Sequence, residues 1–378
     1  MLLTFENLIL MLAVFLIGSC LGSFFKLTAD RYGSGDSFIF KPSYCFNCKN
    51  KLLWWHNIPV ISYLILKGKC FFCKEKIDVN CFYSEIITGL IILALFISGI
   101  IKNHCGFTIG LTLLFSSFLI LLSIFDLKHR TIPHVITYSA IILFFISKCI
   151  LREPVLLSLS SLGIAYIFMD LLYFFASLIK RFEPEINIIS VPLIIWTTSF
   201  FYFHNIYISL IPCVIYLAIT RFKVSHKSYI TLWIVFFLLL LIQIYKIVFI
   251  DLSFSNLSLL CAGFGIIYFI CEIMLYFISL FLSPDKNIPE SENMPVTSKI
   301  SIGGGDITVF ALISVFLGYK LGFIVLFIAS LLAIISHFTI RVISFFKKKP
   351  TEQFSQTIPF VPYISMACFI IIMAFYGN

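Results

Sequence analysis

Ser301-Ile302-Gly303-Gly304-Gly305-Asp306-Ile307 is a glycine run that ends in one carboxylate, at the start of a hydrophobic segment. A carboxylate at the edge of a membrane span is costly, so it indicates a functional residue, and the neighbouring glycines let other backbone approach closely. A second carboxylate, Asp126, ends another long apolar segment. If both aspartates face the same side of a membrane, they can form a catalytic aspartyl pair.

The composition places this stretch in a membrane protein. Of the 378 residues, 60% are hydrophobic and 12% are charged, and the mean hydropathy of +1.05 lies outside the range of soluble globular chains. Because a span needs about 20 apolar residues, we predict an all-α polytopic membrane protein with about 12 transmembrane helices. The predicted spans are residues 7–25, 82–101, 106–125, 133–150, 155–178, 186–203, 206–220, 229–250, 257–282, 307–319, 321–345 and 358–376.

The only sizeable polar region is the loop over residues 26–80, which carries nine lysines and arginines. Cationic loops stay on the cytoplasmic side, so we place this loop inside and both chain termini outside. The net charge of +9 then reflects topology and attraction to anionic membrane lipids, not nucleic-acid binding. The predicted domains are an anchor (1–25), the cytoplasmic loop (26–80), a membrane region with Asp126 (81–150), additional spans and a linker (151–290), and a membrane region with Asp306 (291–378).

Two cysteine pairs lie in this loop, Cys45 with Cys48 and Cys70 with Cys73. The spacing C-x2-C-x21-C-x2-C is typical of a structural Zn²⁺ site in which four thiolates surround the ion. Two disulfides are the alternative, which a reducing cytoplasm disfavours. Because the loop is too small to build a large core, the metal would contribute much of its stability.

Several short motifs follow one another in a recognisable order. They are Gly22-Ser23-Phe24, Pro42-Ser43-Tyr44-Cys45, Trp55-His56-Asn57-Ile58-Pro59, Ser62-Tyr63-Leu64, Lys67-Gly68-Lys69-Cys70, Glu85-Ile86-Ile87-Thr88-Gly89, Asp126 with Ile132-Pro133, Gly303-Gly304-Gly305-Asp306 and Ile358-Pro359-Phe360-Val361-Pro362. Together they resemble the prepilin peptidases, the type IV leader peptidases of bacterial membranes. The resemblance covers roughly residues 15–145 and 300–370.

The resemblance implies a bifunctional aspartic endopeptidase of the bacterial inner membrane. Such enzymes cut the basic leader from prepilins and pseudopilins after a glycine, at the cytoplasmic face, with two aspartates that match Asp126 and Asp306. They then methylate the new N-terminal amine from S-adenosylmethionine, an activity associated with the N-terminal half and its loop. The glycines Gly303, Gly304 and Gly305 would support the second aspartate, and Glu85 is a secondary candidate through its motif.

The chain also departs from this family. Lys26 stands where an Asn is usual and Gly33 where a Pro is usual, and both positions belong to the half associated with methyl transfer. His134 replaces the Asp or Asn that usually follows Ile-Pro, and Thr308 replaces the Lys that usually follows the second aspartate. The last two changes lie close to the predicted catalytic pair.

The largest departure is the distance between the aspartates. Asp306 follows Asp126 by 180 residues, and six predicted spans separate them where the family ordinarily has two. The four additional spans are an even number. An even insertion returns the chain to the same side of the membrane, so the two aspartates are expected on one face.

Other interpretations remain open. An aspartate at a span boundary can simply cap a helix or face solvent. Asp170 and Glu272 lie deeper in predicted spans and could instead serve as ion sites of a non-enzymatic transporter or channel with a zinc-binding loop. Their more ordinary role is hydrogen bonding to neighbouring helices.

Overall fold

The computed structural model describes residues 5–32, 42–45, 47–180, 254–282, 304–346 and 359–375. The regular elements of these residues are all helices, and the residues contain no β-strand. Two isolated bridges join Tyr44 to Lys51 and Lys69 to Lys76. The all-α prediction is therefore confirmed for this part of the chain. The contacts divide the chain into two units, Met1–Ile136 with Ile324–Asn378, and Thr137–Phe323.

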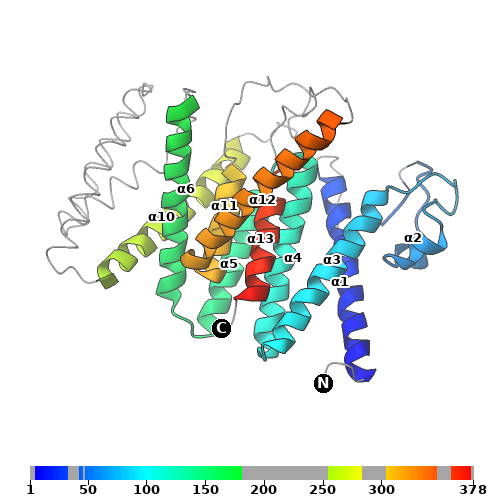
Figure 1. The fold of residues 1–378 in the computed structure, drawn as a ribbon, viewed down its shortest axis with the longest axis horizontal. Coiled ribbons are helices and arrows are strands. Elements are labelled where there is room, and N and C mark those ends of the chain that lie inside the picture. Colours follow the sequence, from blue (N-terminus) through cyan, green and yellow to red (C-terminus); the bar gives the residue numbers. More distant parts are fainter. Residues whose placement is uncertain are drawn as a thin grey trace. The chain divides into compact units, whose positions relative to one another are not determined.

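The first unit is built mainly from long apolar helices (Figure 1). Its elements are α1 (Phe5–Arg31), the 3-10 helix η1 (Trp54–Asn57), α2 (Ile61–Ile65), α3 (Val79–Ile101), α4 (Gly106–His129), most of α12 (Tyr319–Phe346) and α13 (Val361–Ala374). Helix α1 packs against α3, and α4 packs against α3 and α13.

The second unit holds most of α5 (His134–Ile150), together with α6 (Val155–Lys180), α10 (Phe254–Leu282) and α11 (Gly304–Leu317). Helix α6 packs against both α10 and α11. The backbones of α6 and α10 approach closely, since a Cβ on Gly163 would lie 1.8 Å from the carbonyl oxygen of Cys261. The rings of Tyr166 and Tyr268 stack beside this contact, 4.2 Å apart.

Each predicted span that falls in the described residues coincides with a helix, whereas residues 186–203, 206–220 and 229–250 lie outside them. By length and composition, four of the described helices can cross a membrane: Glu6–Arg31, Val79–Ile101, Gly106–His129 and Tyr319–Val342. Shorter apolar helices accompany them at His134–Ile150, Val155–Met169, Cys261–Met274, Gly305–Leu317 and Val361–Ala374. The number of spans stays a prediction.

The contact between α1 and α3 depends on small residues. Gly18 and Gly22 lie four residues apart on α1, the spacing that lets two membrane helices approach closely. A Cβ on Gly18 would lie 2.9 Å from the Cα of Gly89, and one on Gly22 would lie 2.5 Å from the carbonyl oxygen of Ser84. This close approach explains the Gly22 and Gly89 positions of two of the family motifs.

Gly22→Ala should therefore loosen the α1–α3 pair. The added methyl group meets backbone that cannot rotate away, and such overpacking typically costs about 1–3 kcal/mol. Gly110→Ala on α4 is the matched control, because a Cβ there would have nothing within 4 Å. We expect thermal unfolding of the detergent-solubilised protein at a lower Tm for Gly22→Ala alone. Equal Tm values for the two variants would contradict this packing.

Candidate functional site

The four predicted cysteine ligands come together in the loop between α1 and α3. The sulfur atoms of Cys45, Cys48, Cys70 and Cys73 all lie within 4.8 Å of one another, and the Cys45 and Cys73 sulfurs are 3.8 Å apart. A tetrahedral ion with Zn–S bonds of about 2.3 Å requires sulfur separations of about 3.8 Å. The donor set therefore fits a structural Zn²⁺ ion.

The two cysteine pairs occupy matching hairpins, each closed by one of the isolated bridges. In each hairpin the residue after the second cysteine donates its N–H to the carbonyl of the first cysteine, Lys49 at 2.9 Å and Lys74 at 3.0 Å. Both lysines have positive φ, 58° and 60°. Hydrogen bonding from the backbone of Cys73 lowers the pKa of the Cys70 thiol to about 7, which favours the thiolate that binds metal.

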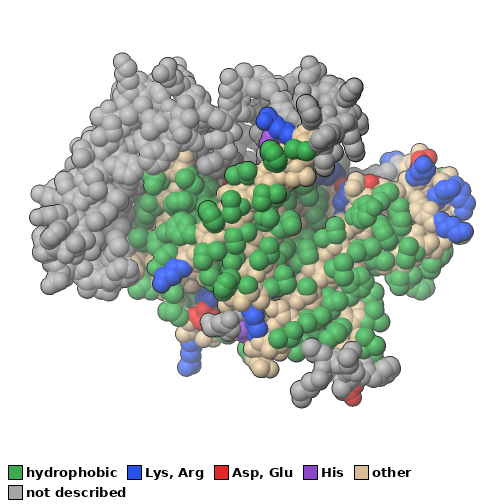
Figure 2. All heavy atoms as spheres, viewed as in Figure 1, with side chains coloured by type: hydrophobic (Ala, Val, Ile, Leu, Met, Phe, Trp, Pro, Cys, Tyr) green, Lys and Arg blue, Asp and Glu red, His purple; other side chains and the backbone are tan. Residues whose placement is uncertain are grey.

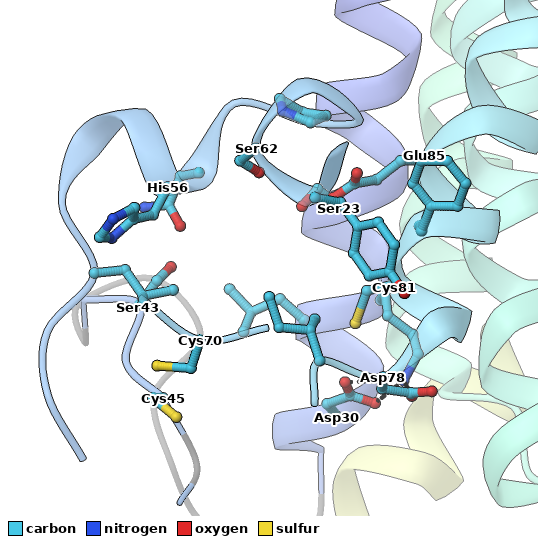
Figure 3. A pocket seen from close by; sticks show the side chains of 18 of the residues that line it. Ser23, Asp30, Ser43, Cys45, His56, Ser62, Cys70, Asp78, Cys81 and Glu85 are labelled. Atoms are coloured by element: carbon cyan, nitrogen blue, oxygen red, sulfur yellow. Dashed lines mark hydrogen bonds and ion pairs between the residues drawn. The ribbon is translucent and has the colours of Figure 1, made fainter. Parts of the chain in front are cut away.

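A pocket of about 810 Å³ lies between this loop and the helices α1 and α3 (Figure 3). Its size is within the range of roughly 300–1,000 Å³ for small-molecule sites. The loop contributes Ser43, Cys45, His56 and Cys70, and the membrane helices contribute Ser23 and Glu85 from the opposite side. The four acids of the lining are Asp30, Glu75, Asp78 and Glu85. Its aromatic side chains are Phe24, Tyr44, Tyr63, Phe71 and Phe82.

Glu85 joins the loop to α3. Its carboxylate accepts a hydrogen bond of 2.7 Å from the backbone N–H of Val60 and another from the hydroxyl of Ser23. Val60 has φ 63° and ψ −53°, and the N–H of Ile61 donates to the carbonyl of Pro59 at 2.6 Å, which makes a γ-turn with positive φ. A β-branched residue in this region is strained, typically by about 1–3 kcal/mol, so the turn needs an external anchor. Glu85 supplies that anchor.

Removal of this carboxylate should release the turn. A hydrogen bond to a charged group contributes about 1.5–3 kcal/mol. We therefore expect Glu85→Ala to speed amide hydrogen exchange over residues 58–66 by about 10- to 100-fold. Glu85→Gln keeps an acceptor oxygen and should have a smaller effect. Unchanged exchange in Glu85→Ala would contradict the anchoring role.

An ion-pair network joins the ends of α1 and α4. The Asp30 carboxylate pairs with Lys26 and with Lys128, each at 2.6 Å. The carbonyl oxygen of Ala29 lies 2.6 Å from Nε2 of His129. Lys26, which stands where the prepilin peptidases usually have Asn, thus has an ion-pair partner one helical turn away, Asp30. Sequence reasoning missed this network, although the i,i+4 spacing of Lys26 and Asp30 was a visible signal.

Asp126 lies near the end of α4 and is buried, with 7% of its surface exposed. Its Oδ2 accepts a hydrogen bond of 3.0 Å from the backbone N–H of Val361, the first residue of α13. The hydroxyls of Ser123 and Ser365 also join the two helices, 2.7 Å apart. Two motifs that lie far apart in the sequence, Asp126 and Pro359-Phe360-Val361-Pro362, are therefore neighbours. Asp126 belongs to α4, but its carboxylate caps the start of α13.

Asp306 belongs to the second unit and lies in the first turn of α11, as expected of a residue that opens a helix. It is partly exposed, and the hydroxyl of Thr308 donates to the carbonyl of Gly305 at 2.9 Å. Helix α11 begins at Gly304, while Gly303 lies outside the described residues. Because Asp126 and Asp306 belong to different units, their pairing stays a prediction.

Glu272 on α10 accepts hydrogen bonds from two tyrosine hydroxyls, Tyr166 at 3.2 Å and Tyr138 at 3.4 Å. Tyr166 lies on α6 and Tyr138 on α5, so the expected hydrogen bonding of Glu272 to neighbouring helices is confirmed. The side chain of Asp170 lies outside the described residues. Glu272 therefore links three helices of the second unit.

Comparisons with known proteins match the part of the chain that contains the four cysteines and Glu85. The family model of the bacterial peptidase A24 N-terminal domain matches residues 16–98. A prepilin leader peptidase/N-methyltransferase of Stutzerimonas stutzeri is 33% identical over 112 residues, 29% of this chain and 37% of that protein. Those of Myxococcus xanthus and Vibrio cholerae are 32% and 34% identical over 122 and 105 residues, 35% and 40% of their own lengths.

The matched part is limited in extent. The alignments span about a third of this chain and less than half of each of these three relatives. No solved structure gives a significant match. The matched residues 16–98 include the four cysteines, most of α1 and most of α3. Residues 16–98 thus match the bacterial peptidase A24 N-terminal domain, and part of the chain is similar to prepilin leader peptidases/N-methyltransferases.

Proposed function

We propose that the protein is a membrane aspartyl endopeptidase that removes the basic leader from prepilins or pseudopilins and then methylates the new N-terminus. The proposal is supported by the family-model match at residues 16–98, by the named relatives, and by the buried carboxylate of Asp126, which accepts from the first N–H of α13. That carboxylate carries the argument, because a buried acid at the end of a span is costly unless it has a use. The site acts at the cytoplasmic face of the inner membrane.

In the proposed cleavage, Asp126 and Asp306 act together. One aspartate takes a proton from water as the water oxygen bonds to the scissile carbonyl carbon, and the other, protonated, donates to the carbonyl oxygen. The C–N bond then breaks and the leaving amine takes the proton. Two carboxylates about 4 Å apart repel by roughly 4 kcal/mol at an effective dielectric of 20, so the pair would share one proton.

For the methyl transfer we propose the pocket beside the loop. S-adenosylmethionine, when bound, supplies a methyl group to the neutral N-terminal amine, which then releases a proton. The pocket suits such a ligand because its volume is that of a small-molecule site, and because its aromatic side chains offer faces for a base. The Zn²⁺ ion would be held by the four cysteines and would fix the loop wall of this pocket.

The test is a reconstituted assay with the purified full-length protein. A prepilin with its leader is incubated with the protein and S-adenosylmethionine, and the product is weighed by mass spectrometry. Loss of the leader reports cleavage, and a further gain of one methyl group reports transfer. An intact prepilin after incubation with folded, zinc-loaded protein would reject the peptidase assignment.

A further inference from the structure

The loop between α1 and α3 exposes a set of large apolar side chains. Trp54 is 79% exposed, Ile65 65%, Leu64 61%, Leu53 47% and Ile61 45%. We call these five residues the loop face. Single exposed apolar residues are ordinary on protein surfaces, but large apolar residues exposed together on two elements in contact mark an interaction site. The five side chains come from two short neighbouring elements, η1 with its preceding residue, and α2.

The opposite side of α2 is packed within the first unit. The ring of Tyr63 stacks on Phe82 of α3 with centroids 4.7 Å apart, and Ser62 and Leu66 line the pocket. Helix α2 therefore has one side against the protein and the other side free for a partner. Ile61, Leu64 and Ile65 lie on the free side.

The position of α2 along α3 indicates which partner this is. The turn that precedes α2 is held by Glu85, which is six residues after the start of α3 at Val79. At 1.5 Å per residue, this anchor lies about 9 Å along the helix. Figure 1 shows α2 beside α3 and not beyond its end. If α3 crosses the membrane, a segment anchored at that depth meets the headgroup and upper acyl region of the bilayer.

The charges of the loop agree with this environment. Residues 42–80 contain six lysines and two acids, and Lys67, Lys69, Lys74 and Lys76 near α2 are all exposed. Figure 2 shows Lys and Arg side chains at the rim of the loop beside hydrophobic ones. Tryptophan concentrates at membrane interfaces, and lysines close to the surface attract anionic headgroups.

We propose that the loop face lies in the lipid interface of the bilayer, with Trp54, Leu64 and Ile65 in the upper acyl region and the lysines among anionic headgroups. The loop is then a surface-bound element with both ends tethered to spans, not a domain free in water. This arrangement keeps the loop, which forms the outer wall of the pocket, beside α3. It concerns where the loop lies and does not rest on the proposed reactions.

Trp54 itself is the probe. In the full-length protein, Trp55, Trp196 and Trp233 are replaced by Phe, and the variant is reconstituted in bilayers that contain phosphatidylglycerol and brominated phosphatidylcholine. Trp54 emission should be strongly quenched by bromines high on the acyl chains and protected from acrylamide in water. A variant that keeps only Trp55, which packs on His56 and Phe71, should be quenched less.

A second variant makes the test specific. Leu64→Glu with Ile65→Glu, placed in the Trp54-only protein, should abolish most of the lipid quenching while zinc content stays the same. Bilayers of phosphatidylcholine alone should also quench less, and equal quenching there would overturn the role of the lysines. If Trp54 is open to acrylamide and untouched by brominated lipid, the loop face lies in water and the proposal is wrong. The loop face would then be a surface for another protein.

Discussion

Asp126→Asn and Asp306→Asn should each abolish leader cleavage, by at least the roughly 10²–10⁴-fold that acid–base groups typically contribute. Asparagine is the informative replacement at position 126. It keeps an oxygen that can accept from the N–H of Val361, so the start of α13 stays capped. Alanine would leave that buried N–H without its acceptor, at a typical cost of about 1–3 kcal/mol. The measurement is mass-detected loss of the leader from a prepilin in reconstituted membranes.

Glu6→Gln is a suitable control, because Glu6 is an exposed acid in the first turn of α1. Its cleavage rate should match that of the unmodified protein. Methyl transfer to a peptide that already lacks its leader should persist in both aspartate variants. Substantial cleavage by either folded variant would exclude that aspartate from the chemistry.

Cys70→Ser should remove the metal and unfold the loop. Structural zinc in small domains contributes apparent binding free energies of about 10–16 kcal/mol, far more than so small a core can supply. We expect bound zinc to fall from stoichiometric to near zero, and limited proteolysis to cut the chain rapidly between α1 and α3. Methyl transfer should be lost and leader cleavage largely retained, because Cys70 lines the pocket and Asp126 does not.

Cys105→Ser controls for the loss of a thiol as such. Cys105 is exposed and precedes α4, outside the loop. It should keep both its zinc and its resistance to protease. If Cys70→Ser kept its zinc, as metal analysis would detect, the four-cysteine site would be wrong. Equal loss of cleavage and methyl transfer would instead contradict the separation of the two activities.

The helices were predictable because they follow from composition over short distances. The predicted span 82–101 corresponds to α3 at Val79–Ile101, and 106–125 corresponds to α4, which continues to His129. The polar ends were underestimated, since hydropathy falls at Asp126 while the helical hydrogen bonds run on. The four-cysteine cluster was equally predictable, because the spacing of the cysteines alone indicates a tetrahedral donor set.

Contacts between residues far apart in the sequence could not be predicted from it. Nothing in the local pattern indicates that Glu85 holds Val60, or that Lys128 pairs with Asp30. Each of these contacts joins residues that are 25 or more positions apart in the sequence. They depend on how α1, α3 and α4 pack, and the packing depends in turn on small residues such as Gly22 and Gly89.

The amino-acid order by itself determined the long apolar helices, the four-cysteine loop and the candidate aspartates, because hydrophobic runs and cysteine spacing act along the chain. Only the tertiary structure decided that Asp126 meets the start of α13, that a pocket forms beside the cysteines, and that α2 is anchored part of the way along α3. The physical reason is that a buried carboxylate must find a donor in three dimensions, and the donor it finds depends on which helices lie beside it.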